Sequence, residues 1–194
     1  MAEGATPELW LVRHAETEWS LTHRHTGRTD IPLTDAGRDA AQALRPRLAQ
    51  HDFALVLVSP LTRAIDTARL AGVGDVAQVR DDLAEWDYGE YEGITTPAIR
   101  ERRPAWYLWR DGVPGGESPD DIGARADRVL AEAMESPGDV AIFSHGHMLR
   151  VLAARWLEQP AAFGGRLYLP TGALSVLGFE RDVRVIRRWN DAAG

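Results

Sequence analysis

Arginine and histidine side chains follow apolar runs at three points of this 194-residue sequence. The runs and the side chains that follow them are residues 9–12 with Arg13 and His14, residues 53–58 with Arg63, and residues 139–143 with His145. Short apolar runs are typical of strands buried on both faces of a parallel sheet. The carboxyl ends of such strands share one edge of the sheet, where α/β proteins bind ligands. We therefore expect the two arginines and the two histidines to lie together.

Guanidinium and imidazole groups gathered at one edge favour chemistry on a phosphoryl group. Arginine pairs its N–H donors with phosphate oxygens, and imidazole can act as a nucleophile, an acid or a base. Helices beginning near residues 61 and 147 would add main-chain N–H groups and the positive ends of helix dipoles. Burying this much positive charge without an anion would be costly, so the combination predicts a site for a dianionic phosphoryl group.

The elements that must position these side chains alternate along the chain. Strands are expected at residues 8–12, 53–58, 76–80, 139–143 and 173–179, with 183–188 as a final hairpin partner. Helices are expected at about 34–50, 61–71, 95–103, 118–135 and 147–158. Thr34 and Ser118 fit helix N-caps, and Pro46 should kink the first helix. The alternation predicts an α/β fold of three layers, in which helices flank a mostly parallel central sheet.

Length and composition favour one domain of a cytoplasmic protein. The chain can form one sizeable core but not two comfortable ones, so we expect a single domain over residues 1–194. It is 44% hydrophobic, has no apolar run long enough to cross a membrane, and begins without a signal-peptide pattern. The net charge of −7 argues against a nucleic-acid partner.

Cysteine and lysine are both absent from the sequence. The absence of cysteine excludes disulfides, thiolate nucleophiles, iron–sulfur clusters and cysteine-bound zinc. The absence of lysine excludes a Walker A lysine, a Schiff base and a lysine-bound pyridoxal cofactor. Covalent catalysis must therefore use histidine, serine, threonine, tyrosine or a carboxylate.

Three ordered motifs carry a family resemblance. LVRHAETEW at 11–19, SPLTRA at 59–64 and SHGH at 144–147 together resemble the histidine phosphatase (phosphoglycerate mutase-like) superfamily. Thr26-Gly27, Pro32-Leu33-Thr34 and Glu85 follow in the expected order, so the resemblance covers nearly the whole chain. It implies a phosphoglycerate mutase-like fold and a phosphomonoesterase that needs no cofactor and acts on a small phosphate ester.

The resemblance also implies a role for five side chains. His14 would be the nucleophile that takes the phosphoryl group on a ring nitrogen, and the charges of Arg13 and Arg63 would keep its pKa low. The two arginines and His145 would bind the phosphoryl oxygens and stabilise the transition state. Glu85 would be the general acid, with a pKa raised by the dianion that it faces, and would later activate water.

Six further residues are expected to contact substrate. They are Ser20, Thr26, Gly27, Tyr88, Arg102 and Gly146, the last through its main-chain N–H. Two positions depart from the family pattern, because Ala15 stands where glycine is usual and Ser20 where many members have asparagine. Neither change removes the chemistry, since alanine is small and serine still donates a hydrogen bond. Asp87 and Glu90 are competing candidates for the general acid.

The segment 85–118 carries many aromatic residues among glycine, proline and arginine, which indicates a lid-like excursion from the sheet. Mutases typically have a longer excursion that keeps water off the phosphoenzyme, so its short length favours a phosphatase. Its sequence is similar to broad acid phosphatases and a sedoheptulose bisphosphatase. We expect hydrolysis of a sugar or glycerate phosphate, with mutase-type phosphoryl transfer as the alternative. Arginines of this segment could bind a second phosphate or carboxylate, namely Arg100, Arg102, Arg103 and Arg110. The alternative is that they form a solvated helix face, which we favour for Arg100.

Paired histidines leave a metal site as a rival hypothesis. His23 and His25 form one pair, and His145 and His147 form the other. Zinc sites usually need three or four protein ligands, and Arg24 would be a poor neighbour for a cation, so we expect no metal. A non-catalytic phosphate-sensing module is a further alternative, against which the complete set of nucleophile, arginines and acid argues. A homodimer is compatible with the sequence.

Overall fold

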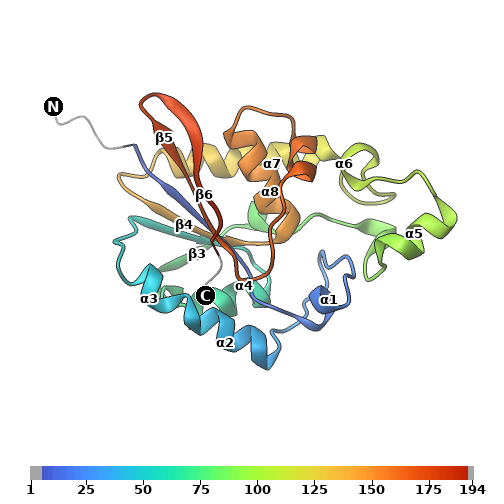
Figure 1. The fold of residues 1–194 in the computed structure, drawn as a ribbon, viewed down its shortest axis with the longest axis horizontal. Coiled ribbons are helices and arrows are strands. Elements are labelled where there is room, and N and C mark those ends of the chain that lie inside the picture. The colour runs from blue at the N-terminus through green and yellow to red at the C-terminus, as the bar shows by residue number, and fades with distance from the viewer. Residues whose placement is uncertain (1–5, 192–194) are drawn as a thin grey trace.

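The computed structural model describes residues 6–191, in which helices cover both faces of a six-stranded sheet (Figure 1). The strands are β1 (Leu9–Arg13), β2 (Leu55–Val58), β3 (Ala77–Val79), β4 (Val140–Ser144), β5 (Leu174–Glu180) and β6 (Val183–Asp191). Their order across the sheet is β3-β2-β4-β1-β5-β6. The first four strands are parallel, whereas β5 pairs antiparallel with β1 and β6 pairs antiparallel with β5. The α/β fold with a mostly parallel central sheet is therefore confirmed.

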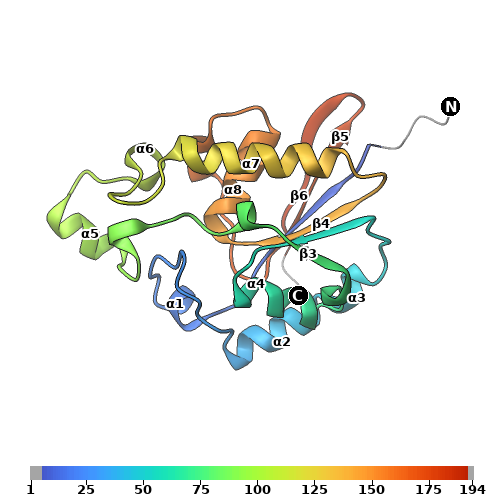
Figure 2. The same ribbon diagram turned by 180° about the vertical axis from the view of Figure 1, so that it is seen from behind.

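Two helical layers enclose this sheet (Figure 2). One face carries α2 (Asp35–Ala43), α3 (Arg45–Leu48) and α4 (Thr62–Leu70), and the other carries α7 (Pro119–Met134) and α8 (Gly146–Trp156). Leu11 of β1 packs into the core under α7 and α8, and its neighbour Val12 packs into the core over α2 to α4. Burial on both faces explains why the strands are continuous apolar runs. Within residues 6–191 no helix has the length and apolar character needed to cross a membrane.

Side-chain hydrogen bonds explain where the long helices begin. The hydroxyl of Thr34 accepts a first-turn N–H of α2 at 2.9 Å. At the start of α7, the hydroxyl of Ser118 accepts the N–H of Asp121, and the Asp121 carboxylate accepts the N–H of Ser118 in return. Residues 34–50 form α2 and α3 instead of one kinked helix, because Pro46 has no N–H to continue the helical hydrogen bonds.

Short helices lie beyond the end at which the parallel strands finish. They are α1 (Glu18–Leu21), α5 (Thr96–Arg102) and α6 (Leu108–Asp111), on the right of Figure 1. Single 3-10 turns occupy Gly74–Val76, Asp81–Leu83 and Gly89–Tyr91, and a longer one occupies Ala161–Arg166. α1 and α6 have four residues each, which is too short to leave a helical period in the sequence.

Most aromatic side chains of the segment 85–118 pack inside the fold. Trp86, Tyr88, Trp106 and Trp109 are at most 4% exposed and belong to the core that continues under α7 and α8. The indole N–H of Trp86 donates to a main-chain carbonyl at 2.9 Å, and so does that of Trp106. Packing therefore accounts for these indoles, and of the four aromatic side chains only that of Tyr88 lines the cavity described next.

Candidate active site

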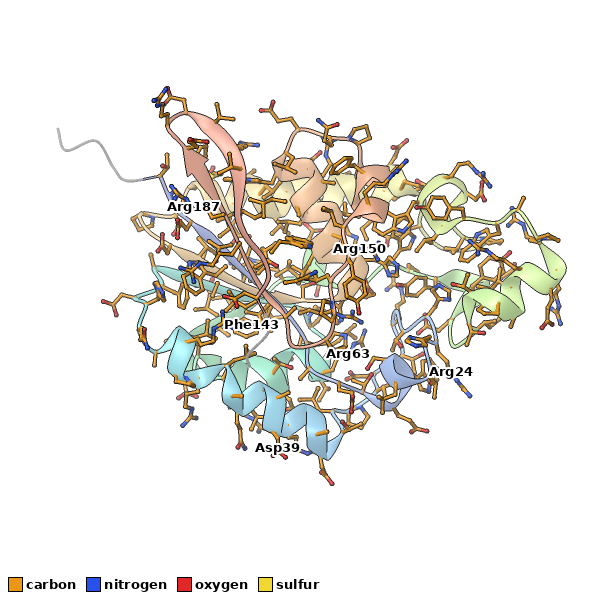
Figure 3. All side chains as sticks on the ribbon, in the orientation of Figure 1. Arg24, Asp39, Arg63, Phe143, Arg150 and Arg187 are labelled. Atoms are coloured by element: carbon orange, nitrogen blue, oxygen red, sulfur yellow. The ribbon has the colours of Figure 1, made fainter. Side chains whose placement is uncertain are left out.

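A cavity of about 240 Å³ lies where β1 and β4 end. Its wall is formed by Arg13, His14, Ser20, His23, Arg24, His25, Thr26, Glu85, Tyr88, Thr96 and His147. These residues come from the end of β1, from α1 and the loop after it, from the segment 85–118 and from the start of α8. Figure 3 shows Arg24 beside α1 and Arg63 closer to the sheet, both at this end of the molecule.

His14 follows β1 and is only 4% exposed. Burial is the main reason that its pKa lies well below the ordinary value of 6.5, and the charges of Arg63 and Arg13 lower it further. The ring is therefore neutral. Its Nδ1 lies 2.7 Å from the carbonyl oxygen of Ala15, which can only accept a hydrogen bond. Nδ1 accordingly carries the proton, and Nε2 has the bare lone pair that a nucleophile needs.

Arg13 ends β1, and its guanidinium group packs against the first residue of α8. Nη1 donates to the carbonyl of Leu169 at 2.5 Å, while Nε is buried without a hydrogen-bond partner among residues 6–191. A Cβ atom on Gly146 would lie 3.1 Å from Cζ of Arg13, so this glycine makes room for the guanidinium group. Arg13 also lines the cavity, where its positive charge favours an anion.

Arg63 is fully buried and holds the loop of residues 26–29. Its Nε donates to Nδ1 of His145 at 3.1 Å, and its terminal nitrogens donate to three carbonyl groups of the loop at 3.0–3.1 Å. The carboxylate of Glu92 accepts two N–H groups of the same loop at 2.9–3.0 Å. One of these N–H groups belongs to Gly27, which therefore does not offer its N–H to the cavity.

His145 lies beside His14, with 5.1 Å between the ring centroids. Burial, followed by the charge of Arg63, keeps its pKa well below the ordinary value, so this ring is also neutral. Nδ1 accepts from Arg63, and Nε2 therefore carries the proton and donates to Oγ of Ser59 at 2.6 Å. Both ring nitrogens bond to protein groups. In this arrangement His145 orients Arg63. The resemblance implies a different role for His145, which is direct contact with the phosphoryl oxygens.

Glu85 lines the cavity and caps the start of α8. Its oxygens accept the N–H groups of Trp86, His147 and Met148 at 2.9–3.0 Å. Burial raises the pKa of Glu85, but the hydrogen bonds and electrostatic attraction of His147 lower it more, and the result lies well below 4.5. Among the groups that lower it, the side-chain hydrogen bond of His147 has the largest effect, ahead of the main-chain N–H at the start of α8. The raised pKa predicted from the sequence applies to Glu85 beside a bound dianion and stays a prediction.

Neither competing carboxylate reaches the cavity. Asp87 accepts from Nε of Arg28 at 2.7 Å and from the N–H of Gly89 at 3.0 Å. Glu90 is exposed and does not belong to the cavity wall. Of the three candidate carboxylates, only Glu85 lines the cavity.

Three histidines of the two predicted pairs, His25, His145 and His147, use ring nitrogens in other bonds. Nδ1 of His147 is 2.6 Å from the hydroxyl of Tyr88, and Nδ1 of His25 is 2.6 Å from the carbonyl of Ile94. Both nitrogens of His145 are bonded as described above. Over the described range 6–191, no three His, Asp or Glu side chains are arranged to hold a metal ion.

The structure places the residues predicted from the sequence in three groups. Those on the cavity wall are Arg13, His14, Ser20, Thr26, Glu85 and Tyr88. Those packed behind the wall are Gly27, Arg63, His145 and Gly146. Arg102 is exposed on α5 and is not brought to the cavity, and neither are Arg100, Arg103 and Arg110. On the wall, the hydroxyl of Ser20 is engaged by the main chain of Thr17, where it caps α1.

Several cavity residues have no substrate role in the sequence-based prediction. They are His23, Arg24, His25, Thr96 and His147. The signal for three of them was the run His-Arg-His directly before Thr26, which the prediction considered only for a metal. The departure at Ala15 is harmless, because its backbone does not adopt a positive φ and its N–H donates to the hydroxyl of Thr67 at 3.1 Å.

Comparison with known proteins agrees with this geometry. The family model of the histidine phosphatase superfamily (branch 1) matches residues 9–192. The chain is 47% identical over 180 residues to an acid phosphatase of Mycobacterium tuberculosis. The aligned region covers 91% of this chain and 88% of that protein. It is 37% identical over 183 residues to the sedoheptulose 1,7-bisphosphatase of Saccharomyces cerevisiae, and this aligned region covers 78% of this chain and 68% of that protein.

The fold comparison gives the same result. A solved structure of an open reading frame from Mycobacterium tuberculosis matches with a TM-score of 0.91 and 43% identity, over 97% of this chain and 99% of that one. Sequence motifs, family model and fold thus agree along nearly the whole chain. The chain belongs to branch 1 of the histidine phosphatase superfamily and is a histidine-dependent hydrolase of phosphate monoesters.

Proposed function

We propose that this enzyme hydrolyses small phosphomonoesters through a phosphohistidine on Nε2 of His14. The observation that carries the proposal is the tautomer of His14. Its hydrogen bond to Ala15 leaves a bare Nε2 in a neutral, buried ring on the cavity wall. Arg13 and the carboxylate of Glu85 line the same cavity.

The reaction has two steps that return the enzyme to its starting state. In the first, the Nε2 lone pair of His14 attacks phosphorus, the P–O bond to the alcohol breaks, and Glu85 passes the proton of the substrate monoanion to the leaving oxygen. In the second, water attacks the phosphohistidine and gives a proton to Glu85, and the P–N bond breaks. Glu85 returns to its carboxylate form as this proton passes to the released phosphate. Arg13 offsets the charge of the phosphoryl group in both steps.

The size and polarity of the cavity support a small, polar leaving group. About 240 Å³ is less than the roughly 300–1,000 Å³ of sites for drug-sized ligands. The wall around the nucleophile is rich in polar side chains, including Arg24 and Thr96. We therefore propose sugar or glycerate phosphates as the substrate class. The cytoplasmic location and the homodimer stay predictions.

Rapid quench with a phosphate ester labelled on phosphorus tests the intermediate. Wild type should form an acid-labile, base-stable adduct that maps to His14 and should release free phosphate. In His14→Ala, the rates of adduct formation and of phosphate release should both fall by several orders of magnitude. His51→Ala is the matched control, because His51 is exposed, packs against Trp10 with the ring planes tilted by 52°, and is not on the cavity wall. A label on another residue, or substantial turnover by His14→Ala, would contradict the proposal.

The same assay distinguishes the alternatives. Label passing to a second alcohol in preference to water would indicate a mutase. A protein that binds phosphate esters and forms no adduct would be a phosphate-sensing module. Turnover that is lost on chelation and restored by zinc would assign His145 and His147 to a metal site.

A further inference from the structure

His25 has a ring nitrogen that no group of the described chain uses. The side chain is 9% exposed and lines the same cavity as His14. Its Nδ1 lies 2.6 Å from the carbonyl of Ile94 and must donate to it, so in the neutral ring Nε2 is a bare acceptor. Nothing in residues 6–191 donates to Nε2, and this atom is not fully enclosed. It is therefore an acceptor open to the cavity.

The ring of His25 is fixed in this orientation by its neighbours. Its centroid lies 4.8 Å from that of Tyr88 and 5.7 Å from that of Trp106, which it meets edge to face. Tyr88 is itself held by His147 through a bond of 2.6 Å. With these contacts and the bond to Ile94, the acceptor is preorganised before a ligand binds.

His25 lies on the side of the cavity where the leaving alcohol must be. Its ring stacks 6.5 Å from that of His147, and the N–H of His147 donates to the carboxylate of Glu85 at 3.0 Å. Because Glu85 serves the leaving oxygen, the rest of the alcohol extends next to this group of side chains. His25 can then meet the atoms that follow the ester oxygen.

The chemistry of the acceptor selects its ligand. A carboxylate has no proton to donate to Nε2, and an ammonium group would meet two cations, Arg13 and Arg24, against the single carboxylate of Glu85 on the same wall. An apolar group would remove water from the lone pair without replacing the hydrogen bond, which is unfavourable. A hydroxyl group provides the required donor without adding charge.

We propose that Nε2 of His25 accepts a hydrogen bond from a hydroxyl group of the leaving alcohol, and that the enzyme thereby selects phosphate esters of polyols over those of apolar alcohols. The inference rests on the proposed function, since it names the substrate class of the same site. It makes His25 a specificity-determining residue that takes no part in bond cleavage.

Two esters that differ only in hydroxyl groups test the proposal. Glycerol 3-phosphate and n-propyl phosphate have the same carbon chain and similar leaving oxygens. Wild type should have a kcat/KM about tenfold higher for glycerol 3-phosphate, the value of one hydrogen bond. His25→Phe should lose this preference, because kcat/KM for glycerol 3-phosphate falls about tenfold more than kcat/KM for n-propyl phosphate. His51→Phe makes the same substitution away from the cavity and should keep the preference.

The possible results separate this inference from the proposed function. Equal rates for the two esters in wild type, or an unchanged preference in His25→Phe, would overturn the role of His25 while hydrolysis stands. If neither ester is hydrolysed, the proposed function fails. The affinities of the protein for the two esters, measured by calorimetry, still report the hydroxyl preference. If His25→Phe does not fold, His25→Leu removes the acceptor without adding volume, and His25→Gln should retain the preference because its amide oxygen accepts.

Discussion

At the scale of single residues, the proposed mechanism requires Glu85 to act as an acid although its surroundings favour the ionised form. It accepts three main-chain N–H groups, and its pKa lies well below 4.5. A phosphate monoester carries a proton of its own below a second pKa of about 6. We infer that the proton given to the leaving oxygen enters with the substrate monoanion and reaches that oxygen through Glu85.

We expect kcat/KM for a sugar phosphate to rise by about tenfold per pH unit as the pH falls from about 8 towards 6, because the monoanion fraction rises in that proportion. The nucleophile does not oppose this rise. The pKa of His14 is lowered well below 6.5, so its ring stays neutral, and the neutral form is lost only when the pH falls through that lower pKa. The measurement is kcat/KM against pH at constant ionic strength. Loss of activity with an apparent pKa near 6.5 on the acid side would contradict it.

A nitrophenyl ester is the control for the proton transfer, because nitrophenolate leaves without protonation. In single-turnover experiments, Glu85→Gln should slow phosphoenzyme formation much more for the sugar phosphate than for the nitrophenyl ester. Equal slowing of both esters would assign Glu85 to positioning. A selective defect in Asp87→Asn or Glu90→Gln would transfer the acid role to that residue.

At the scale of elements, the loop of residues 26–29 couples α4 to the segment 85–118. Arg63 of α4 donates to its carbonyl groups, and Glu92 of the segment accepts its N–H groups. The peptide dipoles are thereby oriented between a cation and an anion. Arg63 also donates to His145, so the geometry of that histidine depends on the loop.

We expect Glu92→Ala to lower the free energy of unfolding by about 1–3 kcal/mol, because two loop N–H groups lose their acceptor. The value of kcat/KM should fall at least about tenfold as Arg63 loses its fixed position. Glu92→Gln retains an oxygen that can accept both N–H groups and should keep most of the activity. Urea denaturation and steady-state kinetics provide the measurements.

Glu90→Ala is the matched control, since Glu90 is an exposed carboxylate two positions before Glu92. It should leave both stability and activity unchanged. If Glu92→Ala also leaves them unchanged, Arg63 holds the loop without help from the carboxylate.

At the scale of the whole molecule, four histidines are kept neutral by the fold. The pKa values of His14, His25, His145 and His147 are lowered from 6.5, with burial as the largest cause in each case. For His25 the value is about 4. The unfolded chain takes up protons at these residues as the pH falls through 6.5, whereas the folded chain does not. Their contribution to stability is therefore complete above 6.5 and is lost as the pH falls towards the folded-state pKa values.

We expect the free energy of unfolding to decrease between pH 6.5 and 5, by up to about 1.4 kcal/mol per pH unit for each of these histidines. Glu85 does not compensate in this range, because a lowered carboxyl pKa contributes full stability above 4.5. The measurement is urea denaturation at several pH values, with His25→Phe expected to show a shallower decrease. A stability that is constant over this range would show that the histidines are protonated in the folded protein.

The sequence by itself determined the sheet, its buried strands and the edge that carries the site. β1 begins and ends within one residue of its predicted bounds, and the N-caps at Thr34 and Ser118 are those predicted. Burial on two faces and helix capping leave local patterns, because they depend on residue types close together in the chain. Arg13 and His14 could be assigned to this edge because they directly follow a buried apolar run, whereas Glu85 was assigned only through the family resemblance.

Only the tertiary structure decided which donors and lone pairs of that site are free. Arg63 and Gly27 carry the expected residue types, yet their N–H groups are occupied by the loop 26–29 and by Glu92. The start of α8 lies 62 residues after Glu85 in the chain and keeps that carboxylate ionised. Arg102 is equally cationic in the sequence and remains exposed on α5. A sequence specifies the hydrogen-bonding groups, but long-range packing decides which partners they meet and therefore which of them can bind a ligand.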